Sequence, residues 1–122
     1  MLASNKVIGI AAVIIIVIVA SLGIVALHDG VLGTTPIKSI TEDYNNWINL
    51  SVTVKGTYRG SFYSLLVVND STGGILVSYE GVIGVSVGDT IIVSGVVKTI
   101  DIILIEFPYI NATEIHTPWV LN

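Results

Sequence analysis

The sequence predicts an all-β domain of five short strands that follows one N-terminal apolar helix. The prediction depends on an uncharged apolar run near the N-terminus, alternating apolar and polar runs after it, and turn residues between those runs. The alternation is clearest in residues 65–97, where Asn69 to Gly74 and the glycine-containing stretch 81–88 separate three apolar runs. Asparagine, aspartate and serine favour turns because their side chains bond the nearby backbone, and glycine does so because it accepts positive φ.

The apolar run Val7 to Leu27 contains no ionisable side chain. Because about 20 apolar residues are needed to cross the core of a bilayer, we expect a transmembrane helix here. The run is rich in β-branched residues, but lipid offers the backbone no other partner, so the helix forms regardless of propensity. A cleaved signal peptide is the alternative interpretation, although its apolar region normally has only about 7–15 residues.

The charges around this run predict its orientation. Lys6 precedes it, whereas Asp29, Glu42 and Asp43 follow it, so the positive-inside rule places the N-terminus in the cytoplasm. We therefore expect a single-pass protein of the cell membrane with an extracytoplasmic C-terminal domain. Residues 1–28 are assigned to the anchor, 29–48 to a linker and lead-in, and 49–122 to the domain.

The alternation also sets the expected strands and their inner faces. The five strands are predicted at Leu50–Tyr58, Tyr63–Val68, Ile75–Tyr79, Thr90–Val97 and Ile102–Phe107. Arg59 to Ser61 is expected to turn the first strand back. Pro108 is expected to bend or end the fifth strand before the chain continues from Tyr109 to Glu114, because proline cannot donate a ladder hydrogen bond. The residues on the apolar phase, which should point into the barrel, are Val54, Val67, Val77 and Val93.

Composition excludes several classes of protein. Charged residues make up 11% of the chain, against about 25% in soluble domains. Beyond the apolar run, four Lys and Arg face nine Asp and Glu, a balance of minus five, and an acidic surface binds nucleic acid poorly. The chain has no cysteine, which excludes disulfides, thiolate metal sites and lipid attachment through cysteine.

The patterns DSTGGILV at residues 70–77 and GDTIIVSG at residues 88–95 resemble those of an OB-fold, a small Greek-key barrel. Within that class the chain resembles the membrane-anchored haem chaperone of cytochrome c maturation, in its anchor and in the stretches Val77 to Gly81 and Gly88 to Gly95. The resemblance implies one N-terminal membrane helix and an extracytoplasmic OB barrel.

The same family holds haem through a histidine, or in some members a cysteine, that follows the barrel and precedes a tyrosine by four residues. Here His116 is followed by Val120 at the tyrosine position, and Trp119 is the nearest aromatic residue. The resemblance therefore implies haem binding by His116 and Trp119 as an alternative function, with part of the attachment motif missing. No cofactor is expected for the main interpretation, and haem belongs to this alternative alone.

Two further groups of side chains are candidates for ligand or modification sites. Aromatic residues on or beside the first three strands could stack planar ligands, as OB-folds do with bases: Tyr58, Phe62, Tyr63 and Tyr79. The acidic balance argues against nucleic acid as that ligand. Three N-x-[ST] sequons are either glycosylation sites or turn-forming asparagines: Asn49, Asn69 and Asn111.

No arrangement of residues in the sequence predicts an enzyme or a metal site. His28 and His116 are the only histidines, and neither accompanies a nucleophile motif. Asp70, Asp89 and Asp101 stand singly at turns, where an aspartate most often caps the turn.

What remains is a binding or assembly module, an accessory subunit of a membrane or cell-surface complex. In the predicted fifth strand the consecutive residues Ile102, Ile103, Leu104 and Ile105 make both faces apolar, so we expect a protein partner to cover one of them. The alternatives are the haem chaperone and, second, a module that binds nucleic acid or another planar ligand.

Overall fold

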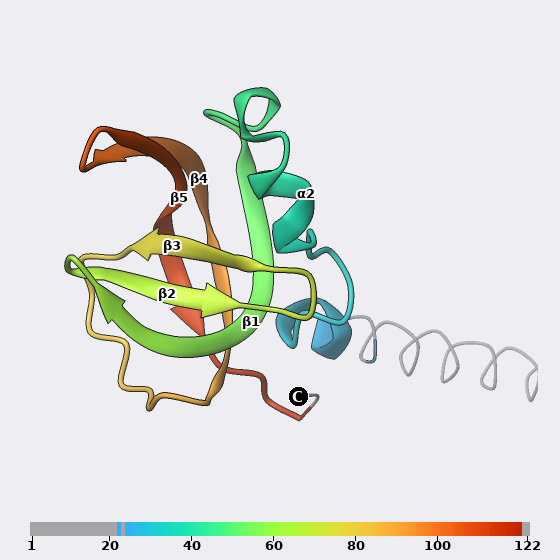
Figure 1. The fold of residues 1–122 in the computed structure, drawn as a ribbon. Coiled ribbons are helices and arrows are strands. Elements are labelled where there is room, and N and C mark those ends of the chain that lie inside the picture. Colours follow the sequence, from blue (N-terminus) through green and yellow to red (C-terminus); the bar gives the residue numbers. More distant parts are fainter. Residues whose placement is uncertain (1–21, 23, 121–122) are drawn as a thin grey trace, which may run out of the picture.

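The computed structural model describes residue 22 and residues 24–120 of the chain, and this part folds around a closed five-stranded barrel (Figure 1). The strands are β1 (Ser51–Phe62), β2 (Leu65–Asn69), β3 (Gly74–Ser78), β4 (Thr90–Ile102) and β5 (Ile105–His116). They follow one another around the barrel in the order β1-β2-β3-β5-β4. β3 and β5 run parallel and the other neighbours antiparallel. The prediction of an all-β barrel of five strands is thereby confirmed.

β1 is longer than predicted because the expected turn at Arg59 to Ser61 is a bulge instead. Its first half, from Ser51 to Thr57, pairs with β4, and its second half, up to Phe62, pairs with β2. The register shifts between Tyr58 and Gly60, and Gly60 has a φ of +112°. A bulge bends and twists a strand, so β1 curves around the barrel (Figure 1) and closes it. The chain reverses later, at Tyr63-Ser64.

The predicted start of the fifth strand at Ile102 is wrong, whereas Ile105 to Phe107 and the predicted continuation from Tyr109 to Glu114 lie in β5. Ile102 ends β4, Ile105 begins β5, and Ile103-Leu104 forms the turn between them. Pro108 does not end the strand, because β5 continues through it and Pro108 lies opposite Thr99. Four consecutive aliphatic residues are typical of a buried strand. Here the middle two form the turn of a long hairpin, and the outer two flank it.

The core fills the barrel and also includes residues from outside it. Val54, Val77 and Val93 are completely buried, as predicted, but Val67 is only half-buried. Residues 65–68 are all apolar, so alternation does not decide which of them point inward. Val68 lies opposite the buried Ile75 of β3 and points inward instead. The buried core residues are Ile37, Ile40, Val52, Val54, Val68, Ile75, Val77, Ile91, Val93, Val97 and Ile110.

Two short helical elements precede β1, within residues 29–48 that were assigned to the linker and lead-in. α2 (Ile37–Thr41) buries Ile37 and Ile40 in the core, and η1 (Tyr44–Asn46) follows it. α2 has no side-chain cap of its own. The N–H of Ile37 donates to Asp70 Oδ2 (3.0 Å), and the N–H of Lys38 donates to Thr72 Oγ1 (3.0 Å). The segment assigned to a linker thus contributes core residues and is fixed by the β2–β3 turn.

The predicted transmembrane helix at Val7 to Leu27 lies mostly outside the described residues. Residues 24–28 are helical. Among the described residues, no helix is long and apolar enough to cross a membrane.

Candidate functional site

The β4–β5 hairpin extends beyond the core residues Val97 and Ile110 and forms an arm, which we define as residues 98–109. Its turn lies on the side of the barrel away from the helical residues 24–28 (Figure 1). Ile103 is 78% exposed, Leu104 101% and Ile105 58%. The structure therefore brings the four predicted partner-facing residues together at the tip of the arm, as a turn and its flanks.

One face of the arm is apolar and joins an apolar groove. Ile100 pairs with Phe107 and Ile102 with Ile105, and residues two apart in a strand share a face. Phe107 also lines an open groove of about 280 Å³ on the outside of the barrel. The other residues that line the groove are Thr41, Val67, Gly74, Ile75, Leu76 and Pro108.

The opposite face of the arm is acidic. Asp101 and Glu106 are direct cross-strand partners, and both are exposed. A hydrogen bond from Tyr44 to Glu106, together with the negative charge of that carboxylate, raises the pKa of the Tyr44 hydroxyl. Lys98, the one cation in the arm, donates from Nζ to Asn49 Oδ1 (2.7 Å). The acidic pair therefore has no neutralising cation within the described part of the arm.

The junction between the helical residues 24–28 and the barrel is a second cluster of polar and aromatic side chains. Asp29 is completely buried, and its carboxylate accepts the N–H groups of Trp119 (2.6 Å) and Val120 (2.9 Å). His28 Nδ1 lies 2.9 Å from Asp29 Oδ1 and donates to it. A carboxylate at a helix C-terminus is unfavourable, and these three donors compensate for it.

Gly30 ends the helix and allows the junction to close. Its φ is +74°, and the N–H of Val31 donates to the carbonyl of Ala26 (2.9 Å), the pattern of a Schellman cap. A Cβ at Gly30 would lie 2.9 Å from Lys55 Cδ and 3.1 Å from Ile92 Cγ1. The helix end therefore packs directly on the outer face of β1 and β4.

The two haem candidates belong to this junction. The Trp119 ring stacks on His28 (centroids 3.3 Å apart, planes at 7°), and the His116 ring lies 4.3 Å from that of His28. His116 Nε2 donates to the His28 carbonyl oxygen (2.7 Å). Its buried Nδ1 lies 3.0 Å from Glu114 Oε1, but the direction does not suit a hydrogen bond. Both candidates are thus engaged in holding the helix to the barrel.

The four aromatic candidates do not form one platform. Phe62 and Tyr63 meet edge to face at the β1–β2 turn, with centroids 4.7 Å apart, and are 47% and 66% exposed. Tyr58 packs against the core. Tyr79 lies after β3, beside Gly81, where a Cβ would approach its ring to 2.6 Å.

The three sequon asparagines lie in different settings. Asn49 is exposed with a φ of +68° and accepts the bond from Lys98. Asn69, half-buried at the end of β2, accepts a bond from Arg59 Nε (3.0 Å). Asn111 is exposed on β5.

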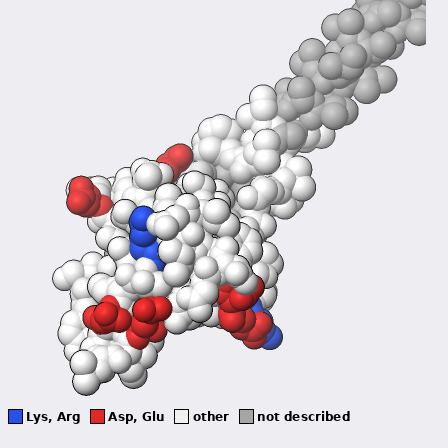
Figure 2. Space-filling model, turned by 90° about the horizontal axis from the view of Figure 1, so that it is seen from above, with Lys and Arg blue, Asp and Glu red and all other residues white. Residues whose placement is uncertain are grey.

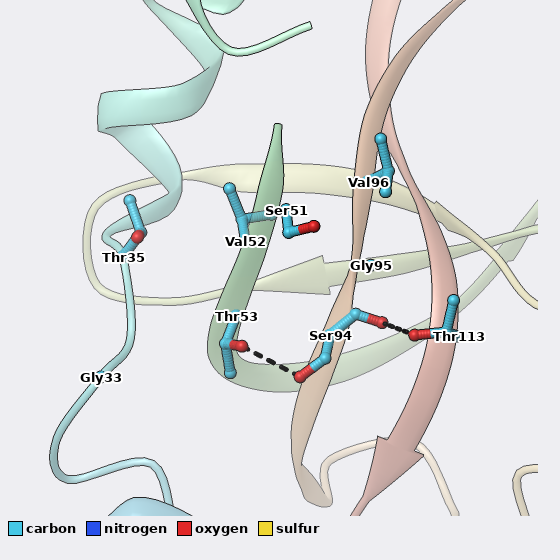
Figure 3. A pocket seen from close by; sticks show the side chains of 9 residues that line it. All are labelled: Gly33, Thr35, Ser51, Val52, Thr53, Ser94, Gly95, Val96 and Thr113. Carbon is cyan, nitrogen blue, oxygen red and sulfur yellow. Dashed lines mark hydrogen bonds between the residues drawn. The ribbon is translucent and has the colours of Figure 1, made fainter. Parts of the chain in front are cut away.

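A pocket of about 320 Å³ lies between the chain at Gly33 to Thr35 and the outer face of β1, β4 and β5 (Figure 3). Hydroxyl groups dominate its lining. Thr53 Oγ1 and Ser94 Oγ lie 3.0 Å apart, and Thr113 Oγ1 donates to the Ser94 carbonyl (3.3 Å). None of the lining residues titrates near neutral pH, so the pocket offers no group for acid–base catalysis.

The charged side chains are sparse and mainly acidic. Figure 2 shows more acidic than basic side chains on one face, separated by large uncharged areas. Two of the three aspartates predicted to cap turns do accept backbone N–H bonds in a turn, and the third does not. Asp70 accepts bonds from the N–H groups of Thr72 and Gly73, and Asp89 accepts one from the N–H of Ser86. Asp101 lies in β4 instead. In the described part of the chain, no three metal-ligating side chains converge.

Sequence reasoning missed Asp29, the acidic pair and Phe107 as parts of these sites. Asp29 stands beside His28 at the end of an apolar run, which gives no sign of burial. The acidic pair could have been found from its symmetric position around Ile102 to Ile105, had that run been treated as a hairpin. A search of known protein families and of curated proteins found no match for this chain.

Proposed function

We propose that the chain is a membrane-anchored, extracytoplasmic interaction module with an OB-fold, an accessory subunit of a membrane or cell-surface complex. The strand order β1-β2-β3-β5-β4 of a closed five-stranded barrel supports the OB assignment. In OB-folds the loops between strands 1 and 2 and between strands 4 and 5 take part in ligand binding. The arm of this chain is built from the second of those hairpins.

The observation that carries the proposal is the exposed aliphatic turn at Ile103-Leu104. Both residues have positive φ, +50° and +65°, as in a type I′ turn. Such turns favour Asn-Gly, because a β-branched residue at positive φ is strained by about 1–3 kcal/mol. The exposed side chains gain nothing from burial in the free protein, whereas a partner pocket would recover about 1.5–3 kcal/mol for each. A turn that costs stability is typical of a functional position.

The experiment exchanges the turn residues for those that the turn geometry favours. The full chain, purified from gently solubilised membranes with its associated subunits, is compared with the double variant Ile103→Asn/Leu104→Gly. We expect the variant to fold and to lose its associated subunits. The matched control is Tyr63→Asn/Ser64→Gly at the β1–β2 turn, where φ is also positive at both positions. An arm variant that retains its subunits would contradict the proposal.

The haem alternative is less favoured because His116 and Trp119 already hold the helix end. The nucleic-acid alternative lacks a cationic face, since four Lys and Arg face nine Asp and Glu beyond the apolar run. Haem added to the purified chain distinguishes the first of these. A Soret band that disappears in His116→Ala would favour the haem chaperone over the assembly module.

A further inference from the structure

The chemistry of a partner for the arm follows from the charges that flank its tip. Asp101 and Glu106 are directly opposite each other, one pair away from the Ile102–Ile105 pair that flanks the turn. Side chains of opposite residues lie about 4.5–5.5 Å apart at Cβ, and like charges in that position destabilise a hairpin. The free arm therefore places two unneutralised carboxylates beside its most exposed apolar side chains.

No cation of the described chain relieves this repulsion. Three ion pairs of the described residues are His28–Asp29, Lys38–Glu42 and His116–Glu114, and none of these three includes the arm carboxylates. Lys98 is bound to Asn49. Tyr44, whose pKa is raised by Glu106, approaches that carboxylate as a neutral hydroxyl. Within the described part of the chain, no cation is seen to neutralise the two arm carboxylates, so a partner molecule could supply one.

We propose that the arm docks into a protein partner whose contact surface is an apolar pocket with lysine or arginine side chains on its rim. The inference rests on the proposed function and adds the chemistry of the partner. The pocket receives Ile103 and Leu104, and the rim cations neutralise Asp101 and Glu106. The groove beside Phe107 extends the apolar contact from the tip onto the barrel.

Two other occupants fit less well. A second copy of this chain would bring the same carboxylates and the same balance of minus five beyond the apolar run, so the two copies repel each other. A lipid surface with anionic head groups would repel the acidic pair too. The arm also projects on the side away from the helical residues 24–28 (Figure 1).

The test uses the full chain in its native membranes, with a photo-crosslinking amino acid in place of Leu104. The adduct yield is compared among the parent chain, Asp101→Asn/Glu106→Gln and Asp101→Lys/Glu106→Lys. The matched controls are Glu80→Gln and Glu80→Lys, because Glu80 is an exposed acid in the β3–β4 loop. Thermal unfolding of the same variants without the crosslinker reports their folding.

We expect the adduct yield to fall severalfold in the neutral double variant and at least tenfold in the charge-reversed one. The Glu80 variants should not change it. The neutral variant should unfold at a temperature about 2–5 °C higher, because like-charge repulsion is removed. Lower binding with higher stability is a combination that a purely structural role of the two carboxylates does not give.

The remaining outcomes separate the inference from the proposed function. If the chain crosslinks to a protein and the yield is the same in all the Asp101 and Glu106 variants, the basic rim is overturned. The proposal that the arm docks into a partner then still stands. An adduct to a second copy of the chain or to lipid would overturn the partner that we propose. The absence of any adduct at position 104 would overturn the docking arm itself, and the proposed function with it.

Discussion

The side chains at the Asp29 junction are hydrogen-bonded and covered, whereas those at the tip of the arm around Leu104 are exposed and strained. At the junction a buried carboxylate has three hydrogen-bond donors, and the rings of His28, His116 and Trp119 cover one another. At the arm a leucine is 101% exposed in a strained turn, beside two carboxylates that repel each other.

The difference teaches that the two regions serve different purposes. Each contact at the junction lowers the free energy of the folded chain, so the junction is explained by the fold alone. The arm raises that free energy through strain and like charges, and its exposed apolar side chains gain nothing from burial. Substitutions should therefore be harmful in the barrel and at its junction, and favourable to stability in the arm.

The largest effect is expected in the barrel wall. Val68→Asp should prevent folding, because a buried unpaired carboxylate costs several kcal/mol, as much as the whole stability of a small domain. The neighbouring substitution Val67→Asp should yield a folded protein, because Val67 lies in the outer groove. Circular dichroism and thermal unfolding measure both. A folded Val68→Asp protein beside an unfolded Val67→Asp protein would show that the inward and outward faces of β2 are exchanged.

The next effect concerns the junction. Asp29→Ala should destabilise the contact between the helix end and residues 119–120 by about 3 kcal/mol, because it leaves two part-buried N–H groups and His28 without their acceptor. Hydrogen exchange at the Trp119 and Val120 amides should rise by about two orders of magnitude. Asp29→Asn is the control, since its amide oxygen still accepts one or both bonds. Unchanged exchange in Asp29→Ala would mean that the carboxylate does not hold the tail.

A smaller effect depends on pH at the β2–β3 turn. Partial burial of Asp70 raises its pKa, but the hydrogen bonds from Thr72, Ile37 and Gly73 outweigh it, so the pKa lies below the ordinary 3.8. A lowered pKa in the folded state gives stability that is present above about pH 4 and is lost as pH falls through the folded pKa. Asp70→Asn should be less stable at pH 7 by about 1 kcal/mol.

The measurement for that prediction is urea unfolding of the parent chain and of Asp70→Asn between about pH 7 and pH 2. The difference in unfolding free energy should shrink below about pH 4. A difference that stays constant down to pH 2 would show that the ionised form of Asp70 contributes nothing.

Strand alternation and turn residues were enough to predict five strands and three of the four inward valines. They could not predict the path of β1, because Gly60 serves equally well in a turn or a bulge and only the pairing decides. Val67 was misplaced because residues 65–68 are all apolar, so alternation does not show which of them point inward. α2 was missed as a core element because its cap comes from Asp70 and Thr72, far along the chain.

The candidate site was predicted only in part. The run Ile102 to Ile105 was identified as an apolar surface, but a turn without glycine, asparagine or aspartate gives no local signal of a hairpin. His116 and Trp119 were identified as a pair, whereas their contacts with His28 and Asp29 join residues about 90 positions apart. Such contacts depend on tertiary packing, which alternation and spacing do not report.

The central claim is that the residues at the tip of the arm favour partner binding and lower the stability of the free protein. Its most direct test is the thermal unfolding of the full chain with Ile103→Asn/Leu104→Gly, beside the control Tyr63→Asn/Ser64→Gly. We predict that the arm variant is more stable than the parent chain by about 1–2 kcal/mol, because the turn strain is removed and no buried contact is lost. The control should gain less, since it also loses the edge contact between Phe62 and Tyr63. An arm variant that unfolds at a lower temperature than the parent chain would contradict the claim, because Ile103 and Leu104 would then stabilise the free protein.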